Sequence, residues 1–368
     1  MFERLHAFLF RLEAERAHNI GSAIARTGQR WAHGYLSRQF EFESDRLRTE
    51  LFGIPMANPF GIAAGFDKNA LLIPFWQALG CGFAEVGSVT GKKSRGNPRP
   101  RAFRLPEEKA IINRMGLNND GSKRIGKRLA RYDPAPLPLA VSIAKTHDPA
   151  IEGQDAVEDF TTTFSRCAPH VSMVVLNLSC PNTREGRTFE DPNALDDLLK
   201  YIMPLRAALE PAPPVLLKLS PPITDRVVLD SEVDEILAVA ALHGVDGYVA
   251  TNTDPGRELL QHTSPEVVKR IGPGGLSGLP LRSRSTQLVR YLYRKTEGST
   301  PIIGVGGVGT GLDAYAKIRA GASLVQLYTS LVYQGPGVFR QLKMDLDQLL
   351  ERDGFASVQE AVGADAWD

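Results

Sequence analysis

Eight short apolar runs recur along the chain from residue 59 onwards, and longer segments of helical character separate them. Each run is mostly apolar rather than strictly alternating, which is typical of a strand buried on both faces. Strands that alternate with helices favour a parallel sheet, and eight such units in about 300 residues predict a closed (β/α)8 TIM barrel of the α/β class. The runs are Pro59–Ala64, Phe83–Val89, Leu139–Ala144, Met173–Leu176, Val215–Leu219, Gly247–Ala250, Pro301–Val305 and Leu324–Leu327.

Two connections between these runs are too long to be simple turns. The stretch Arg95–Asn118 has strand-like patterning and predicts a small hairpin over the mouth of the barrel. The stretch Asp254–Pro280 is rich in glycine and is expected to loop over the same face. Long loops in a compact domain usually carry function, so we expect the active site beneath them.

The first 48 residues form a unit of their own, ahead of a barrel domain at residues 49–368. Apolar residues recur there at helical spacing, and a second helical segment runs from His18 to Arg30. Amphipathic helices with basic and aromatic edges can lie in a membrane interface, or they can pack on the main domain. The pattern leaves both interpretations open. The apolar face of the first helix consists of Phe2, Leu5, Phe8, Leu9 and Leu12.

Composition narrows the class of protein. A hydrophobic content of 43% and a charged content of 23% are those of a globular protein, and a net charge of +1 gives no reason to expect nucleic acid as a partner. Cys81, Cys167 and Cys180 are too few and too scattered for a disulfide framework or a zinc site, so we expect no metal and a reducing compartment. No run reaches the roughly 18 apolar residues of a membrane span. Charged residues interrupt Met1–Arg16, which excludes a signal peptide there.

Polar side chains follow the apolar runs where, in a barrel, the active site lies. Asn177, Cys180 and Asn182 follow the fourth run. Carboxamides both donate and accept hydrogen bonds, which suits a flat polar heterocycle, and a thiol beside them could act as a base or a nucleophile. The alternative is a strand end with asparagines in turn positions and a buried cysteine.

Two further features point to a bound cofactor. Lys218 stands inside the apolar run Val215–Leu219, where an unpaired ammonium would be costly, so it needs an anionic or electron-rich partner. The glycine cluster Gly304–Gly309 follows the seventh run and precedes a helix near Gly311–Arg319. Barrels often bind phosphate between the loops after strands seven and eight.

These motifs together resemble the dihydroorotate dehydrogenase family over nearly the whole chain. The N-terminal residues Glu15–His18 resemble its membrane-associated, quinone-reducing class. The resemblance implies an FMN enzyme that oxidises (S)-dihydroorotate to orotate in pyrimidine (UMP) biosynthesis and passes the electrons to a quinone. It also implies a peripheral membrane protein on the cytoplasmic face of a bacterial-type inner membrane, or on the mitochondrial inner membrane. The motifs are Ala63–Lys68, Ile112–Arg114, Asn177–Thr183, Thr251–Thr253, Gly274–Gly278 and Ile302–Gly307.

The same resemblance implies a role for individual residues. Cys180 would be the catalytic base, and Arg104 would face the quinone. FMN would contact Ala63, Ala64, Gly65, Ser88, Asn113, Ser142, Asn177, Lys218, Thr251, Ser277, Gly278, Gly306, Gly307, Tyr328 and Thr329. The substrate would contact Lys68, Asn113, Arg114, Met115, Gly116, Leu117, Asn177, Asn182, Asn252 and Thr253.

Two positions depart from the pattern of the quinone-reducing class. Cys180 stands where that class usually has serine, and Ser142 stands where it has a flavin-contacting asparagine. Two alternative functions follow. The first is a related FMN barrel enzyme acting on another reduced pyrimidine, and the second is a non-catalytic flavoprotein held at a membrane by its N-terminal helices.

Overall fold

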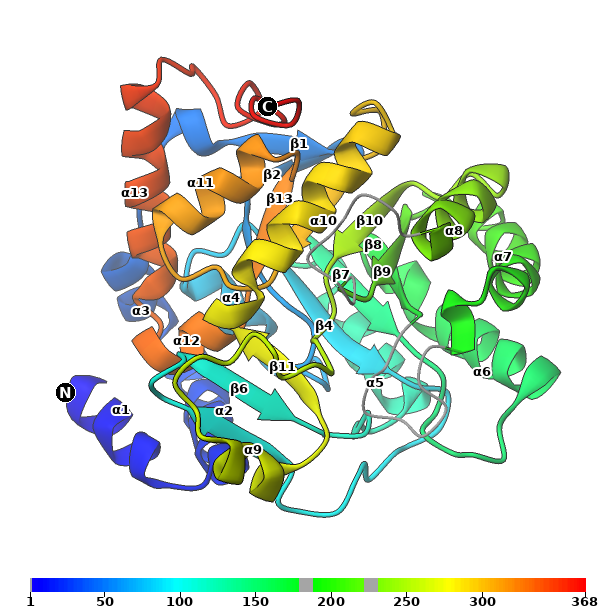
Figure 1. Ribbon diagram of the computed structural model, residues 1–368, viewed down its shortest axis with the longest axis horizontal. Coiled ribbons are helices and arrows are strands. Elements are labelled where there is room, and N and C mark those ends of the chain that lie inside the picture. Colours follow the sequence, from blue (N-terminus) through cyan, green and yellow to red (C-terminus); the bar gives the residue numbers. More distant parts are fainter. Residues whose placement is uncertain (1, 179–187, 222–230) are drawn as a thin grey trace.

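The computed structural model describes residues 2–178, 188–221 and 231–368. Eight parallel strands close into a barrel in the order β10-β12-β13-β3-β4-β7-β8-β9 (Figure 1). Each strand falls on one of the eight apolar runs, so the predicted (β/α)8 barrel is confirmed. The strands are β3 Phe60–Ile62, β4 Phe83–Val89, β7 Leu139–Ile143, β8 Met173–Asn177, β9 Val215–Leu219, β10 Gly247–Ala250, β12 Ile302–Val305 and β13 Leu324–Leu327.

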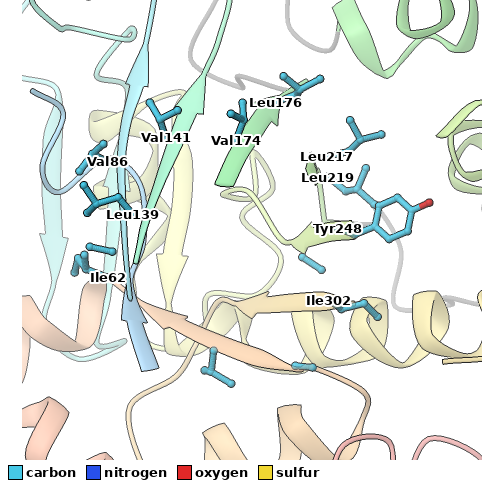
Figure 2. Packing of buried hydrophobic residues seen from close by; sticks show 14 of the residues in the cluster. Ile62, Val86, Leu139, Val141, Val174, Leu176, Leu217, Leu219, Tyr248 and Ile302 are labelled. Atoms are coloured by element: carbon cyan, nitrogen blue, oxygen red, sulfur yellow. The ribbon is translucent and has the colours of Figure 1, made fainter. Parts of the chain in front are cut away.

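Alternate strand residues face outward and pack against a layer of helices. Figure 2 shows outward side chains such as Ile62, Val86 and Leu217, which belong to one large buried cluster. Burial on both faces explains why the strands have mostly apolar sequences. The surrounding helices are α4 Ile73–Ala78, α5 Ser122–Leu129, α6 Gly153–Cys167, α7 Pro192–Ala207, α8 Ser231–Leu242, α10 Arg282–Lys295, α11 Gly311–Arg319, α12 Thr329–Gln334 and α13 Val338–Arg352.

A short antiparallel hairpin, which the apolar pattern did not predict, lies against the interior of the barrel. Its strands are β1 Thr49–Leu51 and β2 Ile54–Met56. Leu51 and Met56 join a second apolar cluster with inward residues of the barrel strands, so the hairpin closes the end opposite the active site. The inward members of this cluster include Phe83, Ala140, Met173, Val175, Leu216, Val249, Ile303 and Leu324.

A three-stranded antiparallel sheet lies outside the barrel (Figure 1). The predicted hairpin is confirmed as β5 Ala102–Leu105 and β6 Ala110–Asn113. The glycine-rich insertion was expected only as a loop, but it contributes helix α9 Pro265–Ile271 and a third strand, β11 Gly275–Gly278, which pairs with β6. The Glu108 carboxylate anchors the insertion by accepting hydrogen bonds from the backbone N–H groups of residues 261 to 263.

Three helices at the N-terminus, α1 Phe2–Arg11, α2 Ala14–Trp31 and α3 His33–Phe40, lie beside the barrel. The two predicted helices are confirmed, and α3 is additional. The carboxylate of Glu13 begins α2 by accepting hydrogen bonds from two backbone N–H groups. Gln29 joins α2 to the start of α4 through hydrogen bonds with the Leu71 carbonyl and the Phe75 N–H. Among the described residues, no helix has both the length and the apolar content to cross a bilayer.

Short 3-10 turns complete the described structure. They are η1 Asp45–Leu47, η2 Ala130–Tyr132, η3 Ala168–His170, η4 Thr188–Glu190 and η5 Leu279–Leu281.

Candidate active site

One cavity of about 850 Å³ extends from the C-terminal ends of the barrel strands, past the outer sheet, to helices α1–α3. Its volume is typical of a site for a small molecule or cofactor. Most residues predicted for the site line this cavity, although they come from ten separate parts of the chain. They are Ala63, Ala64, Gly65, Lys68, Ser88, Arg104, Asn113, Met115, Gly116, Leu117, Asn177, Lys218, Thr251, Asn252, Thr253, Ser277, Gly278, Gly306, Gly307, Tyr328 and Thr329.

A chain of polar side chains joins four strand ends at one side of the cavity. The Asn252 amide donates to Asn177 Oδ1 at 3.1 Å, and the Asn177 amide donates to Ser88 Oγ at 3.0 Å. Ser88 and Ser142 share a hydrogen bond of 2.8 Å between their hydroxyl oxygens. Ser142 is fully buried and supports Ser88 without reaching the cavity wall. The two carboxamides are therefore fixed in orientation before any ligand binds.

Charged and amide groups from three strands form the floor of the cavity. Lys218 Nζ on β9 lies 3.7 Å from Glu85 Oε1 on β4. Gln326 on β13 donates from Nε2 to Glu85 Oε2 at 2.6 Å. Lys218 and Gln326 line the cavity, while Glu85 is completely buried beneath them. The expected anionic partner of Lys218 thus includes a residue of the protein itself, which the sequence analysis missed.

The glycine cluster after β12 curves around one end of the cavity. Gly307 has φ +70°, and a Cβ there would lie 2.4 Å from the Arg282 Cα, so only glycine fits this turn without strain. The Asp313 carboxylate accepts hydrogen bonds from the backbone N–H groups of Gly309 and Thr310 and orders the loop. Nearby, the Ser277 and Thr329 hydroxyls share a hydrogen bond of 2.9 Å.

Lys68 and His18 meet where the barrel mouth faces α2. Lys68 Nζ donates to the Gly65 carbonyl at 2.6 Å. Burial and the positive charge of Arg101 lower the pKa of Lys68 to about 8, although Glu15 and Asp67 oppose this shift. Burial, with the charge of Lys68, lowers the pKa of His18 to about 3, so its imidazole is neutral at pH 7.

A second part of the cavity, the apolar arm, runs between the N-terminal helices and the barrel. Arg104 borders it, with its guanidinium 4.5 Å from the centre of the Phe10 ring and hydrogen bonds to the carbonyls of Leu9 and Leu12. Tyr333 lies 5.3 Å from the Phe10 ring, centre to centre, and its hydroxyl donates to the Ala110 carbonyl. Apolar residues that line this arm are Leu9, Phe10, Ala14, Ile24, Ala25, Leu36, Phe40, Phe75, Leu79 and Val332.

Comparison with known proteins identifies the family. The sequence profile described as dihydroorotate dehydrogenase matches residues 46–350. The chain belongs to the dihydroorotate dehydrogenase family. A protein named dihydroorotate dehydrogenase (quinone) from Roseiflexus castenholzii is 42% identical and is aligned over 100% of this chain and 98% of its own length. One of the same name from Halobacterium salinarum is 43% identical, over 99% of this chain and 100% of its own.

A solved structure agrees with this assignment. The dihydroorotate dehydrogenase of Eimeria tenella, described in complex with ferulenol, superposes with a TM-score of 0.85 at 34% identity and covers 96% of each chain. The N-terminal helices fall inside the alignment with the Roseiflexus castenholzii protein, which covers 100% of this chain, although they precede residue 46, where the match to the dihydroorotate dehydrogenase profile begins.

Two described residues expected from the dihydroorotate dehydrogenase resemblance, Ser142 and Arg114, do not line the cavity. The Arg114 guanidinium donates to the carbonyls of Ile271 and Pro273 and so holds the insertion in place. Cys180 and Asn182 lie outside the described residues.

Proposed function

We propose that this chain oxidises (S)-dihydroorotate to orotate, with FMN as the hydride acceptor and a quinone as the final electron acceptor, in UMP biosynthesis. The observation that carries the proposal is the shape of the cavity. One end presents fixed carboxamides and ammonium groups, and the other is an apolar arm beside three helices. A single cavity with these two ends suits a polar heterocycle and an apolar quinone that exchange electrons through one cofactor.

The residues of the floor and the glycine loop fit FMN. Gln326 Oε1 and Ser330 Oγ are buried at the cavity without a hydrogen-bond partner among the described residues, and a polar ligand would satisfy them. Gly278, Gly306, Gly307, Tyr328 and Thr329 would hold the phosphate end, and Lys218 would lie at the electron-rich edge of the ring. When bound, FMN supplies a two-electron acceptor that no side chain provides.

The carboxamides suit the substrate ring. Asn113, Asn177 and Asn252 lie in the cavity wall, with Thr253 beside them. Each carboxamide can donate to a ring carbonyl and accept from a ring N–H, and Lys68 can pair with the substrate carboxylate. Asn182 would complete this set, on the basis of the family resemblance. Substrate binding by these residues would orient C5 and C6 of the ring.

Cys180 is proposed as the general base that removes the proton from C5. A thiol has a reference pKa of ~8.5, so an appreciable fraction is thiolate near neutral pH, unlike a serine hydroxyl. The proton would pass to the Cys180 sulfur, and the hydride that leaves C6 would need the two-electron acceptor that FMN would supply.

The apolar arm is proposed as the quinone site, with Arg104 and Tyr333 at its border. Helices α1–α3 would lie peripherally on the membrane that contains the quinone, on its cytoplasmic face. Trp31 and Tyr35, with 87% and 64% of their surface exposed, are suited to the interface between lipid and water. Exposed Phe8, Ile20 and Ile24 on the same helices add apolar surface.

Flavin reduction tests the proposal. The purified protein should be yellow, release one FMN per chain on acid treatment, and lose its visible absorbance when mixed anaerobically with dihydroorotate. A soluble quinone analogue should restore the absorbance. Dihydrouracil, which lacks the carboxylate that Lys68 would bind, is the matched control and should leave the flavin oxidised. FAD, no flavin, or equal reduction by dihydrouracil would contradict the proposal.

A further inference from the structure

Glu85 occupies an unusual position for a carboxylate, inside the lumen of the barrel. Its strand neighbour two residues earlier, Phe83, belongs to the apolar cluster that the β1–β2 hairpin closes. Leu216, two residues before Lys218, and Leu324, two residues before Gln326, belong to the same apolar cluster. Side chains two residues apart on a strand face the same way, so Glu85, Lys218 and Gln326 form one polar layer above an apolar layer.

The contacts within this polar layer cross the lumen. Strand β4, which carries Glu85, is not adjacent to β9 or to β13 in the barrel. Glu85 nevertheless lies 3.7 Å from Lys218 Nζ and accepts a hydrogen bond of 2.6 Å from Gln326. Both partners line the cavity, so a carboxylate hidden from the ligand contacts two groups that would touch it.

Structural stability alone gives a weak reason for this arrangement. Replacing a buried ion pair by apolar residues of similar volume is often neutral or stabilising. The apolar layer just below shows that the lumen can be filled without charge. The placement of Glu85 under the one ammonium of the floor therefore indicates an electrostatic role toward the ligand above.

We propose that Glu85 is a positioning residue that sets the reduction potential of the bound flavin by opposing the positive charge of Lys218. The proposal rests on the proposed FMN function. Reduction adds electron density to the flavin, which the Lys218 ammonium at the edge of the ring would stabilise. Without Glu85, Lys218 would stabilise the reduced cofactor more strongly and hinder transfer of electrons to the quinone. The carboxylate keeps that stabilisation moderate and fixes Lys218 Nζ in place.

The potential of three variants tests the proposal. Glu85→Gln keeps the shape of the side chain but removes its charge, so the equilibrium between oxidised and reduced flavin should shift at least tenfold toward reduced flavin. That shift is ~30 mV for a two-electron couple. Gln326→Glu adds a negative charge at the floor and should shift the equilibrium the other way. The double variant Glu85→Gln/Gln326→Glu exchanges the two groups and should return close to the wild-type potential.

Each outcome decides between an electrostatic and a purely structural role. A structural role would change flavin content or thermal stability while leaving the potential of the retained flavin unchanged. An unchanged or lowered potential in Glu85→Gln would overturn the proposal. Loss of flavin from all three variants would also overturn it, because the double variant Glu85→Gln/Gln326→Glu keeps the total charge and side-chain volume of the wild-type pair. Wild-type protein without FMN would instead refute the proposed function, so the two failures are distinguishable.

Discussion

At the scale of single residues, Lys68 gives the substrate site a dependence on pH. Its pKa of about 8 is well below the usual value because of burial and the charge of Arg101. The side chain is therefore mostly a charged ammonium below pH 8 and mostly a neutral amine above it. Only the charged form pairs with a carboxylate. We therefore expect the KM for dihydroorotate to rise tenfold for each pH unit above 8, while kcat changes less because bound substrate stabilises the charge.

Rapid-mixing flavin reduction between pH 6 and 10 would measure this effect. In the matched variant Lys68→Met, which keeps the length but not the charge, KM should be high at every pH and show no rise near 8. A wild-type KM that stays constant from pH 7 to 10 would contradict the assignment of Lys68 to the carboxylate.

Cys180 carries a second prediction at this scale. Positioned proton transfer contributes ~10²–10⁴-fold, so Cys180→Ala should slow flavin reduction by about that factor. Cys180→Ser should be less impaired at high pH and poor near neutrality, because serine without a lowered pKa is the weaker base. The alternative is that Cys180 is a small buried spacer. A Cys180→Ala protein with the wild-type rate and pH profile would establish that alternative.

Apart from Lys218, the sequence predicted polar residues at the ends of strands better than polar residues inside strands. Asn177 and Asn252 were identified because the carboxyl ends of parallel strands meet at the mouth of a barrel, and both line the cavity. Glu85 and Gln326 were missed because a mostly apolar run does not reveal which of its residues face the lumen. Their partners come from non-adjacent strands, and no local pattern encodes that contact.

At the scale of elements, one buried ion pair joins α2 to the sheet at the mouth. Glu15 accepts hydrogen bonds from Arg101 at 2.8 and 3.0 Å, and both side chains are almost completely buried. Burial raises the pKa of Glu15, but the hydrogen bonds from Arg101 and Arg99 outweigh it, so the pKa lies below its usual value. The stabilisation is therefore present above pH ~4.3 and is lost as the pH falls through the lowered pKa.

Glu15→Gln should weaken the packing of α1 and α2 on the barrel by ~3–5 kcal/mol, because it leaves the buried Arg101 guanidinium without its anion. Hydrogen exchange should accelerate in these two helices while the barrel strands keep their protection. Arg99→Met is the control, since 65% of the Arg99 side chain is exposed and its pair with Glu15 is worth ~1 kcal/mol or less. Equal exchange in the two variants would show that this ion pair does not anchor α2.

The elements that the sequence did not predict share a physical cause. β1 and β2 have the exposed residues Glu50 and Pro55 at their centres, and two of the four residues in β11 are glycines, so none of these strands has the apolar sequence of a barrel strand. They are strands because of what they pack against, which is the apolar lumen for the hairpin and β6 for β11. The barrel strands were predictable because burial on both faces leaves its mark on the local sequence.

At the scale of the whole molecule, the N-terminal helices and the barrel divide the two proposed half-reactions. We expect removal of residues 1–41 to abolish turnover with a membrane quinone while dihydroorotate still reduces the flavin. The cut spares Leu47, which belongs to the barrel core. Comparison of a quinone with a water-soluble dye as acceptor would separate the two halves, since the dye should still be reduced. Undiminished quinone turnover by the shortened chain would exclude the helices from the quinone site.

The segment that joins these helices to the barrel is fixed by the far end of the chain. Ser44 donates to Asp347 on α13, 303 positions later, and the Val358 N–H donates to the Arg46 carbonyl. The Lys343 ammonium donates to the last carbonyl of α3, at Phe40. A ribosome adds ~5–20 residues per second, so on the order of 15–60 s separate the synthesis of these partners. Throughout that interval the nascent chain lacks the partners that fix residues 40–46, and the apolar arm, whose lining includes Val332, is completed only after that residue has been synthesised.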